Sequence, residues 1–226
     1  MKKKTPIIQY YVPSGKFEGL GLIIQLAAAA AAACILSLPY ALTEWYCPVI
    51  YLGIFLPWIY ARLSVRLSKF SIVRAKNRSP QMAGLMGLLG MLPGIYLSWA
   101  AWAVLAENIS APGTMNLGWR TVATAESSLH LTQLMTMAAS PLDILQNIQA
   151  ISARGLWSIE QAHINGPLLY LIWTAETFII LFFAYRSSAR YIGRPFSERK
   201  NRYLPQYNLR EPVSLPAKAD SGALFR

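Results

Sequence analysis

Charged side chains are scarce in this chain. Only 14% of its 226 residues are Asp, Glu, Lys or Arg, whereas soluble domains carry about a quarter. Hydrophobic residues make up 54%, and the mean hydropathy is +0.34. This composition excludes an ordinary soluble domain as the main body of the protein. We expect a single domain whose principal solvent is lipid.

Cysteine and histidine are rarer still, with two of each. Two cysteines cannot form a disulfide framework, and no CxxC pair or His/Cys cluster indicates a structural metal. Glu126 and His130 could share a helix face, with His163 as a distant third ligand, but no HExxH-like spacing accompanies them. We therefore expect no metal and no cofactor.

Motifs of enzyme active sites are also missing from the sequence. It has no nucleophile elbow, no P-loop and no dinucleotide-binding fingerprint. The run GLMGLLG at residues 84–90 lacks the Lys and the Ser or Thr of a phosphate-binding loop, and it begins an apolar segment. No catalytic residue is assigned, and a protein without enzymatic activity is the favoured hypothesis.

Positive charge, by contrast, is in excess, with 21 Lys and Arg against 10 Asp and Glu. Basic surfaces attract nucleic acid in soluble proteins. Membrane proteins, however, keep Lys and Arg in short cytoplasmic segments beside their spans, where these charges face anionic lipid. We expect the bilayer and its anionic headgroups as partners, and no nucleic acid.

Four apolar runs are long enough to cross about 30 Å of hydrocarbon. They cover residues 19–38, 45–63, 82–106 and 167–185. The link between the first two, residues 39–44, is so short that these runs must form an antiparallel hairpin. The pattern predicts an all-α membrane protein with four transmembrane helices, three of them within residues 19–106.

The beginning of the chain also resembles a signal peptide, because MKKK precedes an apolar run and three alanines stand before Cys34. The polar lead is long, however, and residues 19–38 exceed the roughly 7 to 15 residues of a signal-peptide core. We expect an uncleaved first span.

The distribution of basic residues predicts the orientation. If residues 1–18 are cytoplasmic, so are the link at 62–81 and the tail at 186–226, and only Arg120 and Arg154 lie outside. The link then forms a basic cytoplasmic face of Arg62, Arg66, Lys69, Arg74, Lys76 and Arg78. We expect a bacterial inner-membrane protein with both termini in the cytoplasm.

Residues 107–166 are the one sizeable segment outside the membrane in this topology. The sequence SPLD at 140–143 predicts a helix start, with Ser140 as the cap and Pro141 in the first turn. A preceding helix is expected over 122–137. We expect short amphipathic helices on or near the outer leaflet, and an extended or disordered tail beyond residue 203.

Small residues are concentrated in the first and third runs. In lipid, small side chains let helix backbones approach closely. We expect the first and third spans to pack on each other, with a homodimer seam as the alternative. The residues expected in this contact are Ala27, Ala30, Gly84, Gly87, Gly90 and Gly94.

Glu176 falls near the middle of the fourth run. An ionisable side chain at that depth is costly and marks a functional site whose partner should be sought. The candidate partners are Gln25, Ser98 and Trp99. We favour a protonated carboxyl that forms hydrogen bonds between helices, and a proton or cation path is the alternative.

Several short motifs resemble a group of bacterial four-span membrane proteins with no assigned activity. These are PSGK at 13–16, VRAKNRSP at 73–80 before a GLLG run, Trp99 with Trp102, GLWS at 155–158, WTAE at 173–176 and PFSE at 195–198. The likeness covers most of residues 10–203 and implies the four-span topology. Relatives of this type carry a PFCExC-like pattern, but Ser197 and Arg199 or Lys200 stand in that neighbourhood here, so no thiolate or zinc role carries over.

The leading hypothesis is a non-enzymatic structural or interaction component of a membrane assembly. It would bind a second copy or other membrane proteins through the outer segment and the basic face. The alternative is a small transporter or channel subunit that uses Glu176.

Overall fold

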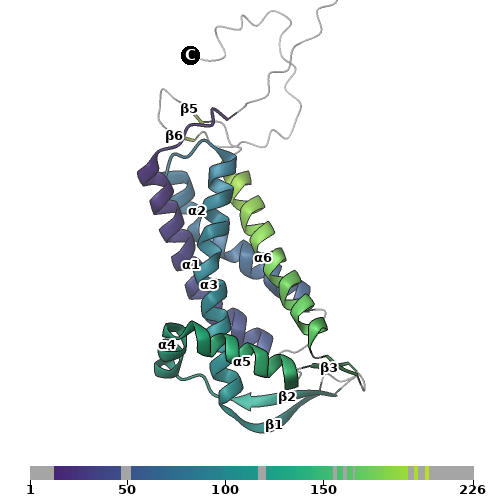
Figure 1. Ribbon diagram of the computed structural model, residues 1–226. Coiled ribbons are helices and arrows are strands. Elements are labelled where there is room, and N and C mark those ends of the chain that lie inside the picture. The colour runs from purple at the N-terminus through teal and green to yellow at the C-terminus, as the bar shows by residue number, and fades with distance from the viewer. Residues whose placement is uncertain are drawn as a thin grey trace, which may run out of the picture.

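The computed structural model describes residues 13–46, 52–116, 121–154, 157–159, 162–164, 166–192, 196–197 and 202–203 (Figure 1). Its helices are Gly19–Tyr46 (α1), Leu52–Arg74 (α2), Pro80–Glu107 (α3), Leu131–Ala139 (α4), Pro141–Arg154 (α5) and Pro167–Ile192 (α6). Three antiparallel hairpins pair Ile109–Asn116 (β1) with Thr121–Ser127 (β2), Trp157–Ile159 (β3) with Ala162–Ile164 (β4), and Phe196–Ser197 (β5) with Arg202–Tyr203 (β6).

Helices α1, α3 and α6 are each long and apolar enough to cross a membrane. They contain 28, 28 and 26 residues, which corresponds to about 40 Å of helix against about 30 Å of hydrocarbon. The chain is therefore a multi-pass membrane protein. Helix α1 packs on α2 and α3, and α6 packs on the same two helices, so that the four long helices form one bundle (Figure 1).

Helix α1 is longer than the sequence predicted. Residues 39–44, expected to link two spans, are helical, and α1 continues through Pro39 to Tyr46. Pro39 removes one backbone donor from the helix, and the hydroxyl of Thr43 donates to the Pro39 carbonyl at 2.7 Å, one turn further on. Trp45, expected to begin the second span, therefore belongs to the first helix.

Helix α2 is more basic than the expected second span. Residues 62–74, assigned to a cytoplasmic link, continue the helix to Arg74. Because this half carries guanidinium and ammonium groups, the described part of α2 is not among the helices that are apolar enough to span a membrane. Residues 47–51, which belong to the first part of the span expected over 45–63, lie outside the described residues.

Helix α3 begins with a side-chain cap, and the turn before it is hydrogen-bonded to the segment that precedes α1. The hydroxyl of Ser79 accepts the Met82 N–H at 3.4 Å, and Pro80 follows in the first turn, where a missing N–H costs nothing. Just before it, the Arg78 N–H donates to the Lys16 carbonyl at 2.9 Å. The segment that precedes α1 and the turn between α2 and α3 therefore lie at the same end of the bundle.

The glycines of α3 allow close packing against two different helices, α1 and α6. A Cβ at Gly90 would collide with Ala29 of α1, and one at Gly94 would collide with Ala33 and the Tyr60 hydroxyl. Gly84 and Gly87 instead face α6, where Tyr185 and Ser188 occupy the space of a side chain. The small residues of α3 therefore bring both α1 and α6 into backbone contact.

The alanines of α1 that are buried in the bundle differ from those predicted. Ala29, Ala32 and Ala33 are buried, Ala30 is half-buried, and Ala27 is exposed. The expectation for Ala27 is therefore wrong in this bundle, because the helical period places it on the outward side of α1.

The segment between α3 and α6 mixes strands with helices. Residues 121–127 form a strand, so the helix expected over 122–137 begins only at Leu131. Helix α5 begins at Pro141, where SPLD predicted a start, and the Ile144 N–H donates to the Ser140 carbonyl. Both helices cross the end of the bundle (Figure 1) and bury Leu134, Met137 and Ile144 against α3.

Candidate functional site: a carboxyl pair inside the bundle

Glu176 lies on the packed face of α6. The buried residues of this helix recur every three or four positions, namely Leu169, Trp173, Glu176, Ile180, Ala184, Ser188 and Ile192. This period faces one side of the helix toward the bundle. Only 7% of Glu176 is exposed, so its carboxyl is enclosed among the helices and is not lipid-facing.

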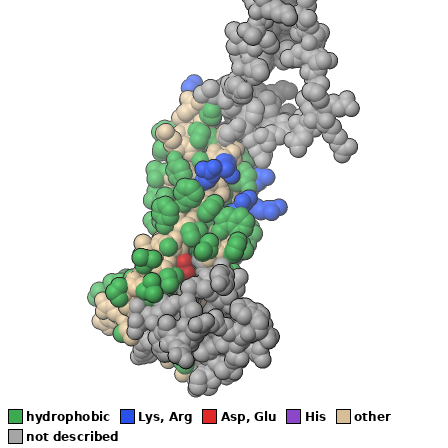
Figure 2. All heavy atoms as spheres, turned by 90° about the vertical axis from the view of Figure 1, so that its right-hand side faces the viewer, with side chains coloured by type: hydrophobic (Ala, Val, Ile, Leu, Met, Phe, Trp, Pro, Cys, Tyr) green, Lys and Arg blue, Asp and Glu red, His purple; other side chains and the backbone are tan. Residues whose placement is uncertain are grey.

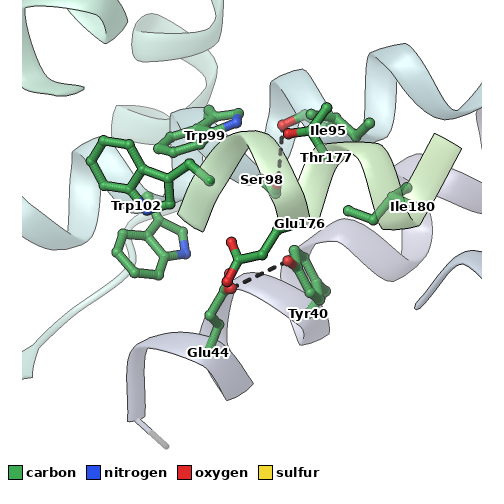
Figure 3. A pocket seen from close by; sticks show the side chains of 10 residues that line it. Tyr40, Glu44, Ile95, Ser98, Trp99, Trp102, Glu176, Thr177 and Ile180 are labelled. Atoms are coloured by element: carbon green, nitrogen blue, oxygen red, sulfur yellow. Dashed lines mark hydrogen bonds between the residues drawn. The ribbon is translucent and has the colours of Figure 1, made fainter. Parts of the chain in front are cut away.

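The partner of Glu176 is Glu44, which was not among the partners predicted from the sequence. Figure 3 shows the two carboxyl groups facing each other, Glu44 from the last turn of α1 and Glu176 from the middle of α6. Glu44 is 6% exposed, and the hydroxyl of Tyr40, one turn earlier, donates to its Oε1 at 3.2 Å. The three side chains connect α1 to α6.

A signal for Glu44 does exist in the sequence. The buried polar and small residues of α1 continue at helical spacing beyond the apolar run, through Ser37, Tyr40 and Glu44. Pro39 and the charge of Glu44 had suggested a link, and that assignment removed the residue from the list of membrane-buried groups. The period of four that joins Tyr40 to Glu44 is the pattern that would have retained it.

Indole rings surround the pair. Trp99 packs edge-on against Trp173 with ring centroids 4.9 Å apart, and Trp45 packs edge-on against Trp102 at 5.3 Å. Such edge-to-face contacts are favourable beyond the area that they bury. The rings of Trp99, Trp102 and Trp173, here called the indole cage, line the space around the two carboxyl groups together with Ile95 and Ile180.

The space enclosed by the cage is small. Its volume is ≈ 20 Å³, which is about the room needed by a single water molecule. Two buried polar atoms, Glu176 Oε1 and Trp102 Nε1, have no hydrogen-bond partner among the described residues. The pair therefore occupies a tight, mainly apolar chamber with unused hydrogen-bonding capacity.

The geometry favours a shared proton between the two acidic groups. Two ionised carboxylates in contact repel each other, and the repulsion is strong where apolar side chains replace water. A carboxyl that retains its proton can donate to the other carboxylate, which makes the two groups a single unit. The pair can serve as a hydrogen-bonded clasp between α1 and α6, or as a place where one proton is held.

The partners predicted for Glu176 divide into two groups. Ser98 and Trp99 line the same chamber, although the Ser98 hydroxyl donates to the Ile95 carbonyl of its own helix at 2.7 Å. Gln25 lies far from the chamber, near the start of α1. Its amide donates to the Ala83 carbonyl at 2.9 Å and accepts from Asn77 at 3.4 Å, so it fastens α1 to the start of α3.

The predicted basic face is carried largely by a helix and not by a link. Arg62, Arg66, Lys69 and Arg74 lie on α2, and Lys76 and Arg78 lie in the turn that precedes α3. Arg62, Arg66 and Arg74 are exposed, and Lys69 is half-buried. This half of α2 adjoins the last turns of α6, which carry further arginines.

No group of three or more His, Cys, Asp or Glu side chains that could hold a metal occurs among the described residues. The side chains of Glu126 and His163 lie outside the part of the chain whose side chains the structure describes. Comparison with known proteins found no match: no family model, no curated protein and no solved structure corresponds to this chain.

Proposed function

We propose that this protein is a non-enzymatic component of a membrane assembly, with four spans, that acts by binding another membrane protein. The observation that carries the proposal is that the two helices expected outside the membrane, α4 and α5, bear apolar side chains on two sides. One side of α4 and α5 is fixed to the bundle through Leu134, Met137 and Ile144. Large apolar side chains also stand on their outward sides.

These outward side chains are Leu131 and Met135 on α4, which are 68% and 70% exposed, and Leu142 and Leu145 on α5, which are 72% and 55% exposed. Each pair is spaced three or four residues apart and therefore shares one helix face. Apolar side chains in such a row are typical of helices that contact a partner or the outer leaflet.

The binding hypothesis predicts crosslinks from these faces. A photo-reactive amino acid at Met135 or Leu142 should give discrete crosslinked bands in intact cells, because those side chains would lie in the interface. Gln133, exposed on the same helix as Met135, is the matched control position and should give markedly weaker bands. Equal yields at all three positions, or products with lipid alone, would contradict a protein partner.

A four-span topology with both termini in the cytoplasm supports the same proposal, since it places α4 and α5 outside. It is favoured by the charge distribution, and by the contact that puts residues 13–18 beside the basic turn at 75–79. It requires that α2, together with residues 47–51, cross the membrane.

We expect a Ser140→Cys variant, made after Cys34 and Cys47 are replaced by alanine, to react with a membrane-impermeant maleimide in intact cells. The matched variant Lys16→Cys should react only after permeabilisation, because residue 16 would face the cytoplasm. Labelling in the opposite order would overturn the orientation and leave α4 and α5 on the cytoplasmic side.

A small transporter or channel subunit is the second candidate function. The observation in its favour is the Glu44–Glu176 pair, since two acidic groups that share a proton are one element of a proton path. The chamber around the pair has room for about one water molecule. A chamber of this size supports a clasp better than a conduit, and the binding function is therefore preferred.

A further inference from the structure

Helices α2 and α6 enclose a groove of ≈ 520 Å³ on the side of the bundle. Four arginines line it, Arg62 and Arg66 from α2 and Arg186 and Arg190 from α6, and aromatic rings of Trp58 and Tyr191 form part of its wall. No carboxylate is among the described residues that line it. A volume of this size is typical of sites that hold a small molecule.

The arginines are arranged as two facing pairs. Arg62 and Arg66 are four residues apart, as are Arg186 and Arg190, so each helix presents two guanidinium groups one turn apart on one face. All four are exposed. Like charges at this spacing destabilise a helix, and an anion between the two helices would reverse that effect.

The groove lies beside apolar parts of the bundle and not only at its end. The Tyr60 hydroxyl donates to the Ala33 carbonyl at 2.9 Å, whereas Ala75, just beyond the end of α2, meets α1 at Gly21. From Gly21 to Ala33 is about 18 Å along α1. Arg62, two residues from Tyr60, therefore lies level with the alanine-rich part of α1.

Figure 2 shows Lys and Arg side chains on this face with hydrophobic side chains above and below them. A charged side chain at the height of an apolar helix is costly and calls for a specific partner. Part of the cost is avoided because long arginine side chains extend toward the interface. An anion bound among the four guanidinium groups would remove most of the remainder.

The remaining wall of the groove is suited to hydrocarbon. Ile59 and Leu63 line it from α2 and are 40% and 47% exposed, and Phe183 lines it from α6. The guanidinium of Arg62 lies 5.0 Å from the centroid of the Trp58 ring. This cation–π contact orients Arg62 and leaves N–H groups available for an acceptor.

We propose that the groove between α2 and α6 binds the phosphate headgroup of an anionic phospholipid. The planar guanidinium fork matches phosphate oxygens in bidentate geometry, and basic pockets between membrane helices are suited to such headgroups. The apolar wall of Ile59, Leu63 and Phe183 accommodates the adjoining acyl chain. The site is independent of the outer helices, so it stands whether or not the proposed partner-binding function does.

The test uses the purified full-length protein in a mild detergent. Native mass spectrometry would count bound lipid during titration with phosphatidylglycerol, with phosphatidylcholine as the neutral comparison and inorganic phosphate as the soluble one. We expect saturable binding of phosphatidylglycerol, at least about tenfold tighter than that of phosphatidylcholine, because charge-assisted hydrogen bonds to the headgroup distinguish the two.

Two variants with equal charge change locate the site. Arg66→Gln with Arg190→Gln removes one guanidinium from each wall, and should weaken phosphatidylglycerol binding at least about tenfold. Arg74→Gln with Lys16→Gln removes the same charge from exposed residues that do not line the groove, and should leave binding within about twofold. Arg66→Lys with Arg190→Lys keeps the charge and should lose part of the affinity.

Three results would overturn the proposal. Equal losses in the two Gln variants would show a general charge effect, and equal binding of the two lipids would show no headgroup recognition. Displacement of the lipid by millimolar inorganic phosphate that then binds in its place would make the occupant a soluble anion. The Lys variant keeps the test decisive if the Gln variant at the groove fails to fold, because loss of the fork alone should still lower affinity.

Discussion

Replacing Gly94 by alanine is expected to lower the free energy of unfolding by about 1–3 kcal/mol, the usual cost of overpacking a well-packed interior. The added methyl group would lie 2.7 Å from both the backbone carbonyl carbon and the Cβ of Ala33, and it would also meet the Tyr60 hydroxyl. Ala33 is fully buried. The backbone of α1 would have to move away, which would also weaken the Tyr60–Ala33 hydrogen bond.

The loss should be visible as a lower midpoint of thermal or detergent-induced unfolding of the purified protein. Gly90→Ala should behave similarly, because its methyl group would collide with Ala29. Gly19→Ala is the matched control, since nothing lies within 4 Å of the methyl position at the start of α1. Its stability should be unchanged or slightly higher, as alanine favours a helix. Equal midpoints for all three variants would mean that α1 and α3 are not in backbone contact.

The helices of the bundle were largely predictable from the sequence. Three of the four apolar runs correspond to α1, α3 and α6, because helix length and hydrocarbon thickness constrain a membrane protein more than any other property. The close approach of α1 and α3 followed from their alanines and glycines. The sequence did not indicate which alanines face α3, because a run of identical residues carries no period. Ala27 was therefore assigned to the wrong face.

The boundaries of α1 and α2 were less predictable. Pro39 and Glu44 predicted a link, yet α1 continues through both. An internal proline removes one backbone hydrogen bond and can kink a helix without ending it. The basic residues from Arg62 onward read as a second link, yet they extend α2. Charge marked these residues as interfacial but could not distinguish a helix from a loop.

The same error concealed the site. Glu176 was identified from its depth alone, but the carboxyl that faces it was placed outside the membrane together with its helix turn. The period that joins Tyr40 to Glu44 could have kept Glu44 in the first helix. It could not predict the pairing, because Glu44 and Glu176 meet only when α1 and α6 come near each other in the bundle. Pairing between distant segments is a property of the packed fold, and a single sequence holds little signal for it.

The interpretation of Glu176 as a clasp predicts an asymmetric response to substitution. Glu176→Gln should leave the unfolding midpoint nearly unchanged, because the amide has the same size and can donate a hydrogen bond to Glu44. Glu176→Leu should cost about 1–3 kcal/mol, the cost of leaving a buried polar group without its partner. Glu44, only 6% exposed, would lose the carboxyl that faces it, although the Tyr40 hydroxyl would still donate to it at 3.2 Å.

The double variant Glu44→Leu with Glu176→Leu is the internal control for that explanation. Replacing both members of a buried polar pair by apolar groups of similar size can be nearly neutral, so much of the loss in Glu176→Leu should be recovered. The four proteins form a double-mutant cycle, and a coupling energy above about 0.5 kcal/mol is expected for groups in contact. Additive losses would show that the two carboxyl groups do not interact.

Proton movement separates a clasp from a path. In proteoliposomes with an imposed pH gradient, the wild-type protein and Glu176→Gln should dissipate the gradient at the same slow rate as empty vesicles. The reason is the chamber, which at ≈ 20 Å³ holds about one water molecule among the described residues that line it, too little water for a continuous proton path. A path would instead require both carboxyl groups to titrate during transport, which Gln cannot do. A proton or cation flux that requires wild-type Glu176 and is lost in a stable Glu176→Gln variant would refute the clasp and favour the transporter.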